Sequence, residues 1–429
     1  MVVTATVLPR GAFSTPANAL DFDMTVAADG SGDYLTVQEA IDAAPNGSSE
    51  ETIIFIKNGT YQEKILVPGN KTHLTLLGED VDSTIIVWDD YSGKVVDGTT
   101  LGTSTSYTFQ ADPDYFKLEN LTIENNAGEV GQAVALLVNG DKVILHHCKL
   151  IGDQDTYYTK GYGRLYMKNC YIEGTTDYIF GRSVAVFDSC KVVSKKSSYI
   201  TAASTEEGYS FGYVFLDCEL TYLPGGLGTF LGRPWRPYAR TVFLRTYMDR
   251  HIQGAGWSEW SGNNNHETCF YAEYACVGSR ARRTYRVDWS HELTEQEAAD
   301  YTIANIFAQT TAPNYSDDWM PQLDSLPYER FVTFNVAGIE DLQEQIQLKV
   351  YPNPAQSRLE VSFHLEEASE VTLRITDLQG RVVQEYPWAF VTAGTRTLAF
   401  DLPELAAGQY QYVLQVGENQ VSNSLIITK

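Results

Sequence analysis

Three short polar clusters recur at an interval of 22 residues in the middle of the chain, and this interval constrains the fold more than any other feature. Gln132 precedes Gln154 by 22 residues, and Asp155 precedes Asp177 by the same interval. The intervening segments carry β-branched and aromatic residues and Gly-containing turns, without helical periodicity. A repeat of about 20 residues is the signature of a stacked solenoid. We therefore predict an all-β fold, a right-handed parallel β-helix with short capping helices.

The repeat also predicts which side chains meet. In a β-helix each turn lies about 4.8 Å above the last, so residues one period apart stack on the same face. Asp155 and Asp177 would then be stacked neighbours, with their carboxyl groups on the order of 5 Å apart. Two carboxylates at that separation cannot both ionise freely, so their pKa values move apart. The spacing therefore predicts an acid/base pair.

Helix signals mark the ends of the coil. Thr36 and Glu39 stand at capping-box spacing before a short apolar helix that Pro45 ends, and this helix should cap the open N-terminal end of the solenoid. A second helix is expected over residues 294–308, because Thr294 and Glu297 repeat the pattern. It should lie against the side or the far end of the coil.

A change of composition near residue 331 predicts a second domain. We expect a tail over residues 1–22, the parallel β-helix over 23–330, a linker over 331–347 and a small C-terminal antiparallel β-sandwich over 348–429. The strands expected in the sandwich are 359–363, 371–375, 397–400, 410–416 and 424–427.

Charge and cysteine usage exclude some partners. The 429-residue chain has a formal net charge of −24, which argues against nucleic acid and anionic membranes as partners. No run of 18 apolar residues is present, so we expect no membrane span. Cys148, Cys170, Cys190 and Cys218 end successive strand-like segments and are expected to stack inside the coil as free thiols, although stacked neighbours are near enough to form a disulfide.

Five sequence blocks resemble, in order and spacing, the signature blocks of pectin methylesterases. These blocks are residues 132–136, 152–156, 177–181, 231–235 and 256–260, and the similarity covers roughly residues 24–290. The resemblance implies a pectinesterase, a carboxylic ester hydrolase that removes methyl esters from the galacturonate units of pectin and releases methanol and pectate. It implies no cofactor and no metal.

The resemblance also implies a role for each residue. Asp177 would be the nucleophile and Asp155 the general acid and then base, while Gln132 and Gln154 would stabilise the anionic transition state. The chemistry is consistent, because a carboxylate can attack an ester if its neighbour protonates the leaving alcohol and neutral donors face the tetrahedral anion.

Substrate contacts are implied as well. Arg233 would fix the nucleophile, Trp235 would form the floor of the sugar site, and Gln132 would also contact the substrate. The substrate-binding Thr that the family places ahead of the Gln132 block has no clean counterpart, and Ser106 is the nearest candidate.

Structural alternatives remain for these residues. The two Asp residues could cap backbone N–H groups, the two Gln residues could form an amide ladder, and Arg233 could be a surface residue. Trp235 could be a core aromatic, and for Trp257 and Trp260 core packing is as good an explanation as substrate contact.

Other functions are also compatible with the fold. Two close carboxyl groups would suit a retaining glycosidase, and polysaccharide lyases are a second enzyme class on a parallel β-helix. An esterase acting on another acylated substrate and a pectin-binding protein with a decayed site are further alternatives. The two Gln donors favour an acyl transition state, and the presence of both Asp residues argues against decay.

The C-terminal module resembles a secretion signal. Residues 350–354, 377–381, 408–410 and 426–429 resemble blocks of the type A sorting domain of the bacterial type IX secretion system. This implies export through the outer membrane to a secreted or cell-surface location, with the secretion machinery as a partner and pectin as substrate of a monomeric enzyme. A carbohydrate-binding sandwich or a passive spacer are the alternatives.

Overall fold

The computed structural model describes residues 22–323 and 348–428. Within the second range, the residues not described are 353–354, 357, 366–368, 377–381, 393, 403–404, 406–407 and 417–418. The chain divides into two compact units, Met1–Arg330 and Phe331–Lys429. The predicted linker and all of the predicted tail except Phe22 lie outside the described residues.

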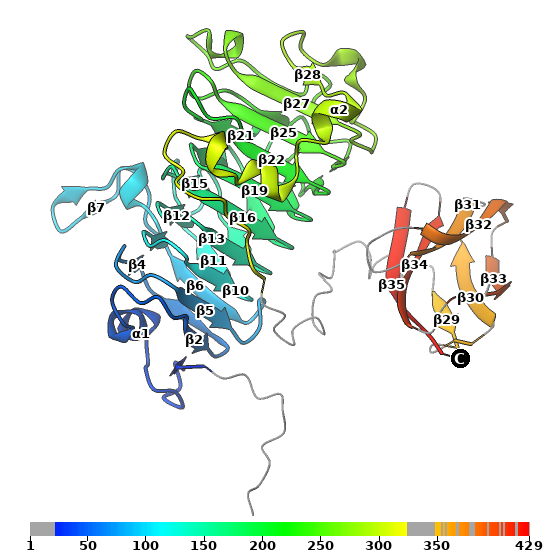
Figure 1. The fold of residues 1–429 in the computed structure, drawn as a ribbon, viewed down its shortest axis with the longest axis horizontal. Helices are drawn as coiled ribbons and strands as arrows, with labels where there is room; N and C mark the ends of the chain where they lie inside the picture. The colour runs from blue at the N-terminus through cyan, green and yellow to red at the C-terminus, as the bar shows by residue number, and fades with distance from the viewer. Residues whose placement is uncertain are drawn as a thin grey trace, which may run out of the picture. The chain divides into compact units, whose positions relative to one another are not determined.

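The first unit is a coil made of three parallel sheets (Figure 1). Sheet A has the order β1 (Met24–Val26), β2 (Thr52–Ile56), β5 (Leu74–Gly78), β10 (Lys117–Glu119), β13 (Val143–His146), β16 (Arg164–Lys168), β19 (Val184–Asp188), β22 (Tyr213–Leu216), β25 (Arg240–Leu244), β27 (Phe270–Tyr274) and β28 (His291–Glu292). Sheet B has the order β3 (Gly59–Gln62), β6 (Thr84–Trp88), β11 (Thr122–Asn125), β14 (Lys149–Ile151), β17 (Tyr171–Gly174), β20 (Lys191–Ser194), β23 (Glu219–Tyr222) and β26 (Tyr247–Met248). Sheet C has the order β4 (Ile65–Val67), β9 (Phe109–Ala111), β12 (Leu136–Val138), β15 (Tyr157–Thr159), β18 (Ile179–Gly181), β21 (Tyr199–Ala203) and β24 (Phe230–Gly232). The predicted parallel β-helix is confirmed.

Short elements decorate the coil. A two-stranded antiparallel hairpin, β7 (Val95–Val96) and β8 (Thr99–Thr100), projects from it (Figure 1). The 3-10 turns are η1 (Thr103–Thr105), η2 (Asn265–Glu267), η3 (Arg283–Tyr285) and η4 (Gln309–Thr311). No helix among the described residues is long and apolar enough to cross a membrane.

The 22-residue interval corresponds to one turn of the coil. In sheet C, Tyr157 of β15 pairs with Ile179 of β18, and Ile179 pairs with Thr201 of β21. Asp155 and Asp177 each stand two residues before a paired position, so they occupy equivalent places on adjacent turns. The register therefore brings the two carboxyl groups to the same edge of sheet C.

The interior of the coil is filled by stacked rows of like side chains. Phe187, Phe215 and Phe243 lie in register on three strands of sheet A, with successive ring centroids 4.3 Å apart. A second row consists of the cysteines 148, 170, 190 and 218, which are buried, and all six cysteines are free. The expected free thiols inside the coil are confirmed.

Helix α1 (Val37–Ala43) closes the N-terminal end of the coil as predicted. The Thr36 hydroxyl accepts the N–H of Glu39, and the buried Val37, Ala40 and Ile41 join the interior cluster. The side chain of Glu63 accepts two further N–H groups of the first turn. Such acceptors satisfy amides that have no partner within the helix.

The expected single helix over residues 294–308 is wrong, because two short helices replace it. They are α2 (Glu295–Ala298), which has the predicted capping box at Thr294, and α3 (Ile303–Ile306). Thr302 has an extended backbone, and its hydroxyl accepts the N–H of Asn305, so a new helix starts there. Ile306 and Phe307 pack on the outer face of sheet A, at the side of the coil.

The second unit consists of two antiparallel sheets. One contains β29 (Lys349–Tyr351), β30 (Arg358–Leu365) and β33 (Gly394–Asp401), and the other has the order β32 (Val382–Val391), β31 (Ser369–Thr376), β34 (Gly408–Val416) and β35 (Asn419–Ile427). The predicted β-sandwich is confirmed, but strand β32 was not expected. It contains Pro387, and because β32 is an edge strand the missing N–H is tolerated.

Candidate active site

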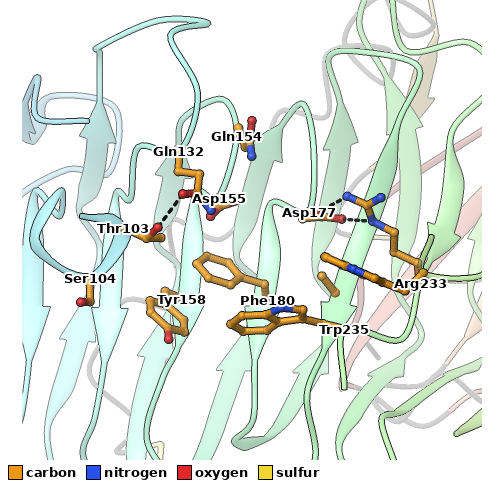
Figure 2. Close-up of a pocket in the computed structure, with 12 residues that line it drawn as sticks. Thr103, Ser104, Gln132, Gln154, Asp155, Tyr158, Asp177, Phe180, Arg233 and Trp235 are labelled. Carbon is orange, nitrogen blue, oxygen red and sulfur yellow. Dashed lines mark hydrogen bonds and ion pairs between the residues drawn. The ribbon is translucent and has the colours of Figure 1, made fainter. Parts of the chain in front are cut away.

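A cleft of about 430 Å³ lies on the outer face of sheet C (Figure 2). It brings together all six residues predicted from the sequence: Gln132, Gln154, Asp155, Asp177, Arg233 and Trp235. Six further residues line it: Thr103, Ser104, Tyr158, Phe180, Ala202 and Trp260. No group of three or more His, Cys, Asp or Glu side chains in the described part of the chain is placed to hold a metal ion.

The floor of the cleft is apolar because one outward-facing position of sheet C repeats on successive turns. Leu137, Tyr158, Phe180 and Ala202 are paired in this row. The rings of Tyr158 and Phe180 stack with centroids 4.1 Å apart, and Trp235 lies 6.0 Å from Phe180 at 58°. Aromatic faces of this kind suit the C–H face of a sugar ring or an ester methyl group.

Asp155 and Asp177 occupy left-handed backbone positions where the chain turns into sheet C. Their φ angles are 68° and 49°. Among residues with a side chain, Asp and Asn tolerate this region best, because their short polar groups bond locally. The turn presents both carboxyl groups to the cleft beside the Gln residues (Figure 2).

Arg233 holds Asp177 through two hydrogen bonds. Arg233 Nε donates to Asp177 Oδ1 over 3.0 Å, and Nη2 donates to Oδ2 over 2.6 Å. The guanidinium lies 3.9 Å from the ring centroid of Tyr199 and 4.1 Å from that of Trp260. Arg233 is therefore fixed by an aromatic ring on two sides, and it is not a loosely held surface residue.

The surroundings give the two carboxyl groups unequal proton affinities. Burial raises the pKa of Asp177, while the hydrogen bonds and charge of Arg233 act in the opposite direction. Burial, and next the charge of Asp177, raise the pKa of Asp155 well above its usual range, and hydrogen bonds from Gln132 and Gln154 offset only part of this. Asp155 therefore keeps its proton at pH values where Asp177 has lost its own.

The two Gln residues occupy adjacent turns, and Gln132 is oriented by Thr103. A backbone bridge pairs Gln132 with Gln154. Thr103 Oγ1 donates to Gln132 Oε1 over 2.6 Å (Figure 2). Because the amide oxygen is occupied, Gln132 presents its NH₂ group to Asp155 and the cleft. Such neutral donors can stabilise an oxyanion.

Sequence reasoning missed Thr103 and Ser104. It favoured Ser106, which is fully buried, and whose hydroxyl donates to the backbone oxygen of Thr103 over 2.8 Å. Ser106 therefore stabilises turn η1 and does not face the cleft. The 22-residue period could not locate Thr103, because hairpin β7–β8 is inserted just before it.

The structure separates the two tryptophans that the sequence left undecided. Trp257 is fully buried, and its Nε1 donates to Glu273 Oε1 over 3.2 Å, so it is a core residue. Trp260 lines the cleft and lies against Arg233.

Both parts of the chain match known families. Residues 23–310 match the family model described as Pectinesterase, and residues 349–428 match the Secretion system C-terminal sorting domain. The chain is 39% identical over 286 residues to Pectinesterase 31 of Arabidopsis thaliana, covering 64% of this chain and 89% of that protein. Pectin methylesterase from carrot is 32% identical with a TM-score of 0.64, and PemA from Erwinia chrysanthemi is 29% identical with a TM-score of 0.63. Each of these two similarities covers 71% of this chain and 100% of the other.

Proposed function

This chain belongs to the pectinesterase family, and from this we propose that it hydrolyses the methyl esters of galacturonate units in pectin, releasing methanol and pectate. The observation that supports this best is the asymmetric carboxyl pair. Arg233 holds Asp177, while burial protonates Asp155 beside two amide donors. This arrangement suits acyl transfer through a carboxylate nucleophile.

In the first half of the proposed reaction, ionised Asp177 attacks the C6 carbonyl carbon of a methylated galacturonate. The carbonyl oxygen becomes an anion, which the NH₂ groups of Gln132 and Gln154 stabilise. The tetrahedral intermediate then expels the methoxy group, and Asp155 gives its proton to the leaving oxygen. Methanol departs, and an acyl–Asp177 anhydride remains.

In the second half, Asp155 is ionised and acts as a base. It takes a proton from a water molecule, whose oxygen attacks the C6 carbonyl carbon of the anhydride. The same two amides stabilise the second oxyanion, and collapse expels the carboxylate of Asp177. Free galacturonate leaves, with Asp155 protonated and Asp177 ionised as at the start. The aromatic floor of Tyr158, Phe180 and Trp235 would hold the sugar rings in place.

Product analysis tests this function directly. Highly methylated pectin is incubated with the full chain, while methanol, new reducing ends and the absorbance of unsaturated products are followed in parallel. Methanol release without either kind of chain cleavage supports the esterase. New reducing ends would instead indicate a glycosidase, and unsaturated products a lyase.

The pH dependence follows from the required protonation states. Asp177 must be ionised and Asp155 protonated, so kcat/KM should rise with pH through the pKa of Asp177 and fall through that of Asp155. Both limbs lie above the usual range for Asp, since burial raises both pKa values. Arg233→Gln removes the cation that lowers the pKa of Asp177, so the acid limb should move to higher pH as activity falls.

A pH profile of methanol release measures this shift. Arg236→Gln is the matched control, because its guanidinium lies 4.7 Å from the Trp235 ring centroid and donates to Trp235 O instead of Asp177. An acid limb that stays in place in Arg233→Gln would contradict the assigned role of Arg233.

Thr103→Val should lower kcat about tenfold with a smaller change in KM. The substitution keeps the shape but removes the 2.6 Å hydrogen bond that orients Gln132, and one such bond contributes about 1 kcal/mol. The loss should appear in kcat, because the amide acts on the transition state. Ser104→Ala, which alters the neighbouring residue in the cleft wall, should retain near-normal kcat. Equal effects of the two substitutions would argue against the orienting role.

The C-terminal domain determines where the enzyme acts. Its match to a secretion sorting domain indicates export, to the cell surface or the medium, where pectin is found. We place the catalytic domain at residues 23–330 and the sorting domain at 348–429, which agrees with the division of the chain into two compact units.

A further inference from the structure

A second, smaller cavity lies on the outer face of sheet B. Its volume is about 250 Å³, and it is lined by Gln62, Val87, Trp88, Asp89 and Asn126. None of these five residues belongs to the cleft on sheet C.

The ends of three adjacent strands form this cavity. Gln62 of β3 pairs with Val87 of β6, and Trp88 pairs with Asn125 at the end of β11. Asn126 N donates to Trp88 O over 2.9 Å, which keeps the two residues adjacent. Val87 is buried and forms the floor, while β3 is the edge strand and leaves that side open.

The lining side chains offer the chemistry that binds a pyranose ring. Trp88 is half-buried and its Nε1 is buried, so ring carbon faces the cavity. Among the described residues, the side-chain amides of Gln62 and Asn126 have no hydrogen-bond partner. Asp89 binds Lys94 through Oδ1 at 2.7 Å, which leaves Oδ2 as an acceptor. An indole surface, two free amides and one carboxylate oxygen match the C–H face and hydroxyl groups of a sugar.

Charge around the cavity favours a neutral sugar over an acidic one. The nearby lysines are already used, since Lys94 pairs with Asp89 and Asp90, and Lys64 pairs with Asp90. Glu124, paired in register with Val87, adds another acidic group, although burial raises its pKa. A free galacturonate would meet this acidic surface, whereas its methyl ester would not.

The cavity lies close to the catalytic cleft along the chain. Asn126 is six residues before Gln132, so the two lie within about 22 Å of each other. Ser92, three residues after Asp89, donates its N–H to Gln132 O over 2.8 Å. A polymer can therefore occupy both places at once, whereas a short oligomer cannot.

From these observations we propose that the cavity is a secondary binding site for methyl-esterified galacturonate units, and that it holds unreacted polymer beside the cleft. The identity of the polymer rests on the proposed function. Simultaneous binding at two places raises apparent affinity for long chains without a new catalytic group.

Kinetics on long and short substrates test the site. Trp88→Ala should raise KM for polymeric pectin about fivefold and leave kcat unchanged. The same variant should leave kcat/KM for a short methylated oligogalacturonide unchanged, and Trp88→Phe should restore most of the affinity. The double variant Gln62→Ala/Asn126→Ala, which alters only exposed side chains, should reproduce the KM effect. Unchanged KM for polymer in both Trp88→Ala and the double variant would overturn the proposal.

A binding measurement separates this proposal from the catalytic one. Long methylated and de-esterified oligogalacturonides of equal length are titrated calorimetrically into Asp177→Asn, with and without Gln62→Ala/Asn126→Ala. We expect the added substitutions to weaken binding of the methylated oligomer about fivefold and to leave binding of the de-esterified one unchanged. An equal effect on both oligomers, or none on either, would overturn the site. Absence of methanol release from the wild type would instead overturn the catalytic function.

Discussion

Asp177→Asn should lower kcat for methanol release by about 10⁴-fold or more, because an amide cannot replace the carboxylate that attacks the ester. The substitution should not disturb folding. Asp177 has a φ angle of 49°, a conformation that Asn adopts at least as easily, and the Asn side-chain oxygen can still accept a hydrogen bond from Arg233. The measurement is methanol release from highly methylated pectin, with the thermal midpoint as a check on the fold.

Asp217→Asn is a closely matched control for this substitution. Asp217 also has a positive φ, of 52°, and Arg245 also holds it with two hydrogen bonds, each of 2.7 Å. This pair lies on the exposed surface and does not line the cleft. Asp217→Asn should therefore keep full activity. Substantial methanol release by Asp177→Asn, or equal losses in both variants, would show that the carboxyl-pair mechanism is wrong.

The 22-residue period was sufficient to predict the coil and the position of one carboxyl relative to the other. It succeeded because parallel strands stack in register, so an interval in sequence becomes a step along the coil axis. The period does not reach Arg233, which stands 56 residues after Asp177. The turn between β21 and β24 is longer, since Thr201 pairs with Gly232, 31 residues later. Only the resemblance to a family identified Arg233 from sequence.

Other features were decided by contacts that sequence patterns do not carry. Trp257 and Trp260 are three residues apart in one irregular segment, yet the first faces the core and the second the cleft. Helix α3 starts at a Thr cap inside what reads as one helical stretch. In each case the side chain's direction depends on which part of the coil it packs against. Local propensity does not specify this choice.

The C-terminal end of the coil contains a buried charged cluster centred on Glu273 of β27. Arg286 donates to its two carboxylate oxygens over 2.8 and 2.9 Å, Arg283 donates over 3.3 Å, and Trp257 Nε1 over 3.2 Å. The side chains of Glu273 and Arg286 are only 2% and 1% exposed. Trp257 is in turn bridged to Gly232, the residue before Arg233. The cluster thus links the end of the coil to the cleft.

Glu273→Gln should destabilise the catalytic domain by about 3–5 kcal/mol, because it leaves the buried guanidinium of Arg286 without its counter-ion. In a domain of this size that loss corresponds to a fall in the thermal midpoint on the order of 10 °C. Glu292→Gln is the control, since Glu292 is 70% exposed and lies 3.5 Å from the same Arg283. An exposed pair contributes at most about 1 kcal/mol, so the control should melt within a few degrees of the wild type. Differential scanning calorimetry of the full chain measures both. If Glu273→Gln melted with the control, the cluster would not be stabilising the end of the coil, and the unfavourable burial of its charges would then roughly equal their attraction.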